Sequence, residues 1–209
     1  MLVRNALGIG LGVGAYGISF GAAATTAGLS VTQTCALSLL VFTGASQFAL
    51  VGVLGAGGTV LAAVASALLL GSRNALYAVR LADLLRLRGA RRLLAAQVTI
   101  DETMAMSAAA PPRHARFAFC VTAVSVYGLW NLATLLGAVG AAAVDTRALG
   151  LDAAVGAGFL ALLRLQVHGR TALAVAVGGA AVAACAIPFT SPGVPVLLAS
   201  LAVLPAVRR

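Results

Sequence analysis

Long apolar stretches with almost no charge are the feature that most constrains how this chain folds. Of its 209 residues, 61% are hydrophobic and only 9% are charged, and the mean hydropathy is +1.05. A soluble domain is typically about 25% charged, so a water-soluble fold is excluded. A transmembrane helix needs about 20 apolar residues. The chain therefore predicts an all-α integral membrane protein, embedded in a lipid bilayer as a single transmembrane domain over residues 1–209.

Turn residues and charges divide the chain into about seven predicted transmembrane helices. These cover residues 6–27, 31–54, 59–79, 117–143, 148–164, 171–187 and 193–207. Residues 93–110 are also apolar, but counting them as a further span moves the following arginines to the outside, against the positive-inside rule. We therefore expect 93–110 to form an interfacial or re-entrant helix that returns to the side it came from.

The fourteen arginines indicate how the helices are oriented. Seven of them lie in the long interruption 80–116, and positive charge collects on the cytoplasmic side of a membrane. Counting spans from that segment places the N-terminus outside and the C-terminus in the cytoplasm. The arginines lie between apolar runs and form no single basic face, so nucleic-acid binding is not expected.

Glycine is concentrated in the first predicted span, with six glycines between Gly8 and Gly21. Small residues at four-residue spacing let helix backbones approach closely, but each glycine also weakens a helix by about 1 kcal/mol relative to alanine. Two interpretations stay open: a tight packing face, or a broken first helix whose freed backbone groups bind a substrate. The binding residues in the second case are Gly17, Ser19, Phe20 and Gly21.

Polar side chains inside the second and fourth predicted spans are candidates for helix contacts or for binding. Thr43, Ser46 and Gln47 are spaced to share one helix face, where they either join helices or line a polar cavity. Trp130, beside Asn131, is the only tryptophan and falls near mid-membrane rather than in an interfacial belt. That position suits a packed core or the wall of an apolar pocket.

Ionisable residues near membrane depth are costly and are usually functional or paired. Arg73, near the end of the third predicted span, either reaches the cytoplasmic headgroups or contacts a substrate. Asp101 and Glu102, within 93–110, either form a solvated interfacial face or meet the inner mouth of a cavity. The cysteines show no metal-binding spacing and the chain has no phosphate-binding glycine motif, so no metal or other cofactor is predicted.

An ordered series of short motifs resembles the AzlC-type branched-chain amino acid permeases. The matching stretches are 16–21, 27–30, 42–48, 72–77, 99–103 and 130–137. The resemblance extends from about residue 5 to the final arginines. The chain departs from the family pattern at Ala15, where proline is usual, at Gly71 and Asn74, where Asn and His flank the arginine, and at Ala133, where glycine is usual.

The resemblance implies a bacterial secondary transporter subunit, not an enzyme. It would export leucine, isoleucine, valine and, as a further candidate, methionine across the cytoplasmic membrane, together with a small AzlD-type membrane partner. On this interpretation Arg73 meets the substrate carboxylate, and Asp101 or Glu102 carries a proton or binds the ammonium. An alternative is a membrane-embedded substrate-capture subunit of an ATP-driven transporter. An intramembrane protease with Ser46 as nucleophile is a third hypothesis, and the glutamine that follows Ser46 disfavours it.

Overall fold

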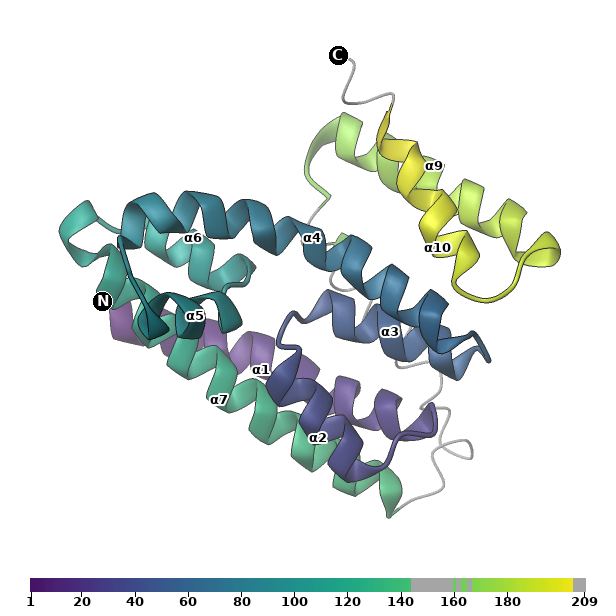
Figure 1. The fold of residues 1–209 in the computed structure, drawn as a ribbon, viewed down its shortest axis with the longest axis horizontal. Coiled ribbons are helices and arrows are strands. Elements are labelled where there is room, and N and C mark those ends of the chain that lie inside the picture. Colours follow the sequence, from purple (N-terminus) through teal and green to yellow (C-terminus); the bar gives the residue numbers. More distant parts are fainter. Residues whose placement is uncertain (144–159, 161–162, 165–166, 205–209) are drawn as a thin grey trace.

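The computed structural model describes residues 1–143, 160, 163–164 and 167–204, and all regular structure in these residues is helical (Figure 1). Four stretches are long and apolar enough to cross a bilayer. They are α1 (Leu2–Thr26), α4 (Val60–Leu85), η1 with α7 (Pro112–His114 and Ala115–Ala142), and α9 with η2 (Gly169–Ala186 and Ile187–Phe189). The prediction of an all-α, multi-pass membrane protein is confirmed.

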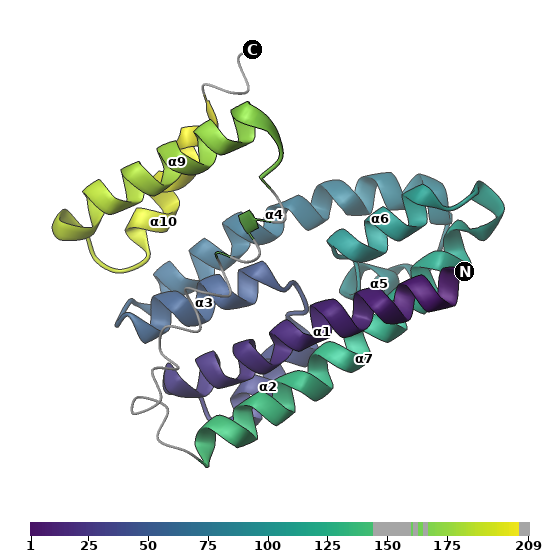
Figure 2. The same cartoon turned by 180° about the vertical axis from the view of Figure 1, so that it is seen from behind.

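Helices α1 and α7 pack side by side and run in the same direction (Figures 1 and 2). Glycines make this contact, because a Cβ at Gly10 would collide with Ser125 and one at Gly21 would collide with the backbone of Thr134. The tight-packing interpretation of the first span is therefore confirmed. Its alternative, a broken first helix around 17–21, is wrong, since α1 is continuous over its 25 residues.

The break occurs instead in the second predicted span. Residues 31–54 form two short helices, α2 (Val31–Leu40) and α3 (Ala45–Gly55). A Cβ added at Gly55 would lie 3.2 Å from the Cβ of Ala27, next to the end of α1, so α3 returns to the end from which α2 entered. We call α2 and α3 hairpin A. The prediction that 31–54 crosses the membrane is wrong, because α2 ends at Leu40. Gly44, just before α3, adopts φ +65°, a conformation that glycine tolerates and that redirects the chain into α3.

Residues 93–110 lie in a second hairpin, which returns to the end it came from, as the prediction of an interfacial or re-entrant segment expected. It consists of α5 (Ala90–Gln97) and α6 (Asp101–Ala109), with a break at 98–100. Its two ends lie close together, because Nε of Arg116 in α7 donates to the carbonyl oxygen of Leu85 in α4 at 2.6 Å. We call α5 and α6 hairpin B. Since α4 connects the two hairpins across the molecule, hairpin B enters from the end opposite to hairpin A (Figure 2).

This arrangement changes the expected position of the N-terminus. Because α1 runs parallel to α7, Met1 lies at the same end of the molecule as the start of α7 and the arginine-rich segment 80–116 (Figure 1). The prediction that the N-terminus lies opposite that segment is wrong. Because hairpin A does not cross the membrane, the chain crosses it one time fewer before residue 80 than the sequence predicted.

The described C-terminal region contacts the start of α4 through Gly193 and α10 (Val194–Ala199). In this region, α9 contacts α10 and η3 (Ser200–Val203), and Gly193 lies against Ala62 of α4. Of the predicted span 193–207, the described residues form a short apolar helical stretch, Val194–Val203. The predicted span 148–164 falls almost entirely outside the described residues, as do the last two arginines.

Candidate functional site

A cavity of about 250 Å³ lies where the two hairpin breaks meet α1, α4 and α7. Drug-sized ligands usually occupy about 300–1,000 Å³, so this cavity suits a small molecule. Its polar side is formed by Thr43, Arg73, Asp101 and Glu102. Its apolar side includes Val13, Phe42, Leu70, Ile100, Val126 and Trp130.

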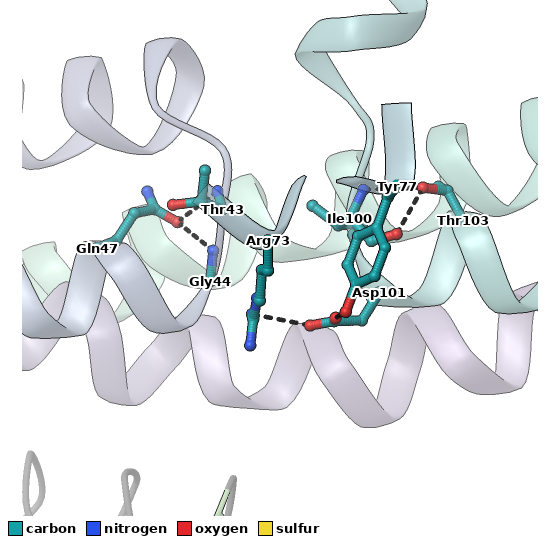
Figure 3. A network of polar contacts seen from close by, with 8 residues as sticks. All are labelled: Thr43, Gly44, Gln47, Arg73, Tyr77, Ile100, Asp101 and Thr103. Carbon is teal, nitrogen blue, oxygen red and sulfur yellow. Dashed lines mark hydrogen bonds and ion pairs between the residues drawn. The ribbon is translucent and has the colours of Figure 1, made fainter. Parts of the chain in front are cut away.

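Gln47 holds the break in hairpin A in place (Figure 3). Its side-chain oxygen accepts the backbone N–H of Gly44 at 3.1 Å and that of Thr43 at 3.5 Å, and its amide nitrogen donates to the carbonyl oxygen of Leu37 at 3.3 Å. These bonds satisfy backbone groups that the break removes from the helix. The prediction that Thr43 shares a helix face with Gln47 is therefore wrong, because Thr43 lies within the break and Gln47 follows it.

Thr103 has the equivalent position in hairpin B. Its hydroxyl oxygen accepts the backbone N–H of Ile100 at 2.9 Å and lies 3.0 Å from the carbonyl oxygens of Val98 and Ile100. Thr103 is fully buried. In both hairpins, the third residue of the second half-helix thus fixes the residue just before that half-helix.

An ion pair from two different elements lies at the cavity. Nη2 of Arg73, on α4, is 2.8 Å from Oδ2 of Asp101, the first residue of α6. Tyr77, one turn after Arg73, donates its hydroxyl to Oδ1 of Asp101 at 2.6 Å (Figure 3). The Arg73 and Asp101 side chains keep 32% and 27% of their surface exposed, so a molecule in the cavity can reach both. Arg73 is directed to this pair rather than to the end of its helix.

Glu102 is a second carboxylate at the same cavity, and its surroundings differ from those of Asp101. It lines the cavity beside Asp101, but no described side chain forms an ion pair or hydrogen bond with it. Both acidic residues lie in the first turn of α6, where the helix dipole favours negative charge. Among the described residues, the site therefore contains one carboxylate in an ion pair and one without a side-chain partner.

The N-termini of two half-helices meet at this cavity. Gly44 precedes α3, Ile100 precedes α6, and both line the cavity. The first N–H groups of a helix have no partner within that helix and carry partial positive charge. Such an N-terminus favours an anionic group of a ligand, and the end of α3, which carries no acidic residue in its first turn, is the one open to it.

An aromatic cluster supports Trp130, which forms part of the cavity wall. The ring of Trp130 stacks on Phe20 with centroids 6.0 Å apart and meets Phe48 edge-on at 6.3 Å. Phe20 and Phe48 are fully buried, and Trp130 is 2% exposed. Trp130 is thus both a core residue and a cavity wall, so the two interpretations of its position are compatible.

A family model described as AzlC protein matches residues 8–144. The chain belongs to the AzlC family. The match contains α1, both hairpins, α4 and α7, and with them the ion pair, Glu102 and the aromatic cluster. No curated protein and no solved structure matches the chain. The AzlC chain is therefore a multi-pass membrane protein of a transport family.

The structure brings together only part of the predicted site of this AzlC chain. Thr43, Arg73, Asp101, Glu102 and Trp130 line the cavity. The residues predicted to bind substrate that lie outside its lining are Gly17, Ser19, Phe20, Gly21, Ser46, Gln47 and Asn131.

Several of those residues contact other parts of the protein instead. Gly17 and Gly21 face α7, and Phe20 supports Trp130. Asn131 donates its side-chain amide to the carbonyl oxygen of Tyr127 at 2.8 Å. Ser46 is 2% exposed and packs toward Gly71. Serine in that position has no histidine beside it among the described contacts, which leaves no support for a protease.

Several residues at this site of the AzlC chain were not predicted: Ile100 and Val126 line the cavity, and Tyr77 bonds to Asp101 beside it. Tyr77 had a usable signal, because it lies four residues after Arg73 and therefore on the same face of α4. Ile100 and Val126 had none, since a buried aliphatic residue in an apolar run does not differ from its neighbours.

Proposed function

We propose that this chain is a secondary transporter subunit that exports leucine, isoleucine and valine, with methionine as a further candidate, across the bacterial cytoplasmic membrane. The observation that supports this most is the composition of the small cavity between the hairpins. It combines an arginine, two carboxylates and an apolar wall. An aliphatic α-amino acid carries the complementary groups: a carboxylate, an ammonium and an apolar side chain.

The cavity suggests how such a substrate is held. Arg73 and the N-terminus of α3 receive the carboxylate, and Asp101 receives the ammonium. Val126 and Trp130 face the aliphatic side chain, whose full burial contributes about 1.5–3 kcal/mol. Arg73 and Asp101 pair with each other in the structure, and the zwitterionic substrate would replace each partner with one of its own charges.

The proton gradient is the proposed energy source. The chain has no phosphate-binding motif, and an elementary charge crossing the membrane gains about 2.3 kcal/mol per 100 mV. Asp101 and Glu102 are the carboxyl groups of the cavity, and one of them carries the proton. Glu102 is the stronger candidate, because no side chain of the described residues forms an ion pair or hydrogen bond with its carboxylate.

Orientation and partner complete the proposal. The positive-inside rule places the arginine-rich segment 80–116 in the cytoplasm, and the N-terminus lies with it at that end. The C-terminus is proposed to be cytoplasmic as well. A small AzlD-type membrane protein is the proposed second subunit. The alternative, a substrate-capture subunit of an ATP-driven transporter, requires an ATPase partner instead.

Transport in proteoliposomes tests the proposal. Vesicles containing the chain, with and without its small partner, are loaded with labelled valine and given a proton gradient. We expect gradient-driven valine efflux that Arg73→Ala removes and that Arg80→Ala, which changes an exposed arginine of the same helix outside the cavity, leaves in place. Valine efflux that ignores the gradient and requires ATP with an ATPase supports the alternative. No valine movement in any condition refutes both.

A further inference from the structure

The two hairpins belong to units that repeat one arrangement. The first unit, 30–85, contains α2, a break, α3 and the long α4, and the second, 89–142, contains α5, a break, α6 and the long α7. The hairpins enter from opposite ends (Figure 2), so the units have opposite orientation. Inverted repeats with broken helices at the binding site are typical of secondary transporters, in which one repeat moves against the other.

One side chain joins the two breaks directly. Gln97, the last residue of α5, donates its amide to the carbonyl oxygen of Leu39 at 2.9 Å and to that of Leu40 at 3.0 Å. Both carbonyls belong to the last turn of α2, where they lack a partner within the helix. A glutamine amide has two N–H donors, so this contact uses both of them. The Tyr127 hydroxyl also donates to the Leu39 oxygen, at 3.1 Å.

The position of this contact separates it from ligand binding. Gln97, Leu39 and Leu40 do not line the cavity between the hairpins, and all three are exposed on the outer surface. In a bilayer no water replaces a lost donor, so an unpaired carbonyl there is costly. The cavity is lined instead by other residues at the breaks, among them Gly44 of hairpin A and Asp101 of hairpin B.

We propose that Gln97 is a positioning residue for transport, whose amide ties hairpin A to hairpin B and keeps Gly44 and Asp101 at opposite sides of one cavity. This inference rests on the proposed function. Because the tie crosses the boundary between the two repeats, it controls how the repeats move together. It does not touch the substrate, so its loss affects turnover and cavity access more than substrate affinity.

The change Gln97→Glu tests the tie, since it keeps the length of the side chain and replaces the two amide donors with acceptors facing carbonyl oxygens. We expect kcat for valine efflux to fall about tenfold or more, the factor implied by two lost hydrogen bonds of ordinary strength, with KM changed less than about twofold. Gln33→Glu is the matched control. The Gln33 side-chain oxygen accepts the Ser30 N–H at 2.8 Å, and a glutamate keeps that acceptor, so transport stays at the parent level.

A labelling experiment measures cavity access without requiring transport. Thr43→Cys places a thiol in the cavity lining, in a chain whose native Cys35, Cys120 and Cys185 are replaced by serine. An impermeant thiol reagent is applied from each side of the vesicle. We expect Gln97→Glu to raise the labelling rate from at least one side about tenfold. If Gln97→Glu does not fold, Gln97→Met, which removes both donors at similar size in an exposed position, replaces it.

The outcomes distinguish this inference from the proposed function. Parent-level kcat in Gln97→Glu and Gln97→Met refutes the tie, and so does a rise in KM at unchanged kcat, because that identifies a substrate contact. If the parent chain moves no valine, the proposed function fails. The labelling rates then decide on the tie alone, since equal rates in parent and variant overturn it.

Discussion

Replacing Tyr77 with phenylalanine separates the organisation of the ion pair from its charge. The change removes one hydroxyl and keeps the ring, so it leaves no new cavity. The lost bond is the 2.6 Å contact to Oδ1 of Asp101, and a hydrogen bond to a charged group contributes about 1.5–3 kcal/mol. Each 1.4 kcal/mol corresponds to a factor of about ten. We therefore expect Tyr77→Phe to raise KM for valine by about tenfold to a hundredfold.

Valine efflux from proteoliposomes gives KM and kcat for this variant, and thermal melting in detergent verifies that it is folded. Tyr127→Phe is the matched control. It also loses one hydroxyl, but that hydroxyl donates to the neutral carbonyl of Leu39 away from the cavity, so we expect its KM to stay within about threefold of the parent. The control also shows whether loss of any tyrosine hydroxyl impairs binding.

A double-mutant cycle shows whether Tyr77 acts through Asp101. If it does, adding Tyr77→Phe to Asp101→Asn changes KM by less than about twofold, because the interaction is already lost. Two results refute the reasoning: an unchanged KM in folded Tyr77→Phe, or fully additive effects in the double variant.

Three further changes test other parts of the structure. Gly21→Ala forces α1 away from α7 and is expected to lower the unfolding free energy by about 1–3 kcal/mol, measured by melting. Its control is Gly12→Ala, whose Cβ meets nothing within 4 Å and which is expected to leave the unfolding free energy undiminished. Gly44→Ala places a side chain at φ +65° and is expected to lower the unfolding free energy by about 1–2 kcal/mol, measured by melting. Valine binding by this variant is expected to be weaker as well. Glu102→Gln is expected to abolish the dependence of efflux on the proton gradient while valine binding persists; gradient-driven efflux in this variant would assign the proton to another group.

Hydropathy predicted the membrane class and the long helices of this chain but not which apolar segments cross. The segments 31–54 and 59–79 are similarly apolar, yet only the second belongs to a crossing helix. The difference arises after Leu40, where α2 ends, at Gly44, whose positive φ redirects the chain into α3, and at Gln47, whose side chain pairs with the freed backbone groups. Gly44 and Gln47 both stand out in the sequence. Their ability to form the break depends on the Leu37 carbonyl, which accepts from Gln47, and on packing between helices. Helical periodicity in the sequence predicts neither contact.

In the candidate site too, single residues could be identified from the sequence, but contacts between residues far apart in the chain could not. Arg73 and Asp101 were each conspicuous as charges in apolar surroundings, so the sequence identified both. Their pairing was not predictable, because it depends on hairpin B folding back beside α4. Of the two interpretations of the glycines in the first span, the packing face is confirmed, and its signal was local because it is a four-residue spacing. Gly17 and Gly21 were expected to bind substrate, but they lie outside the cavity because their face of α1 is covered by α7.

The corrected topology also strengthens the charge argument from which the orientation was inferred. Counting 31–54 as a span placed Arg4 outside, opposite the seven arginines of 80–116. With hairpin A returning to its own side, Arg4 lies at the same end as those seven. A single arginine is too weak a signal to reveal the error by itself, since the bias is a sum over loops. The parallel packing of α1 and α7 supplies the missing constraint, because it places Arg4 and the arginines of 80–116 at the same end of the molecule.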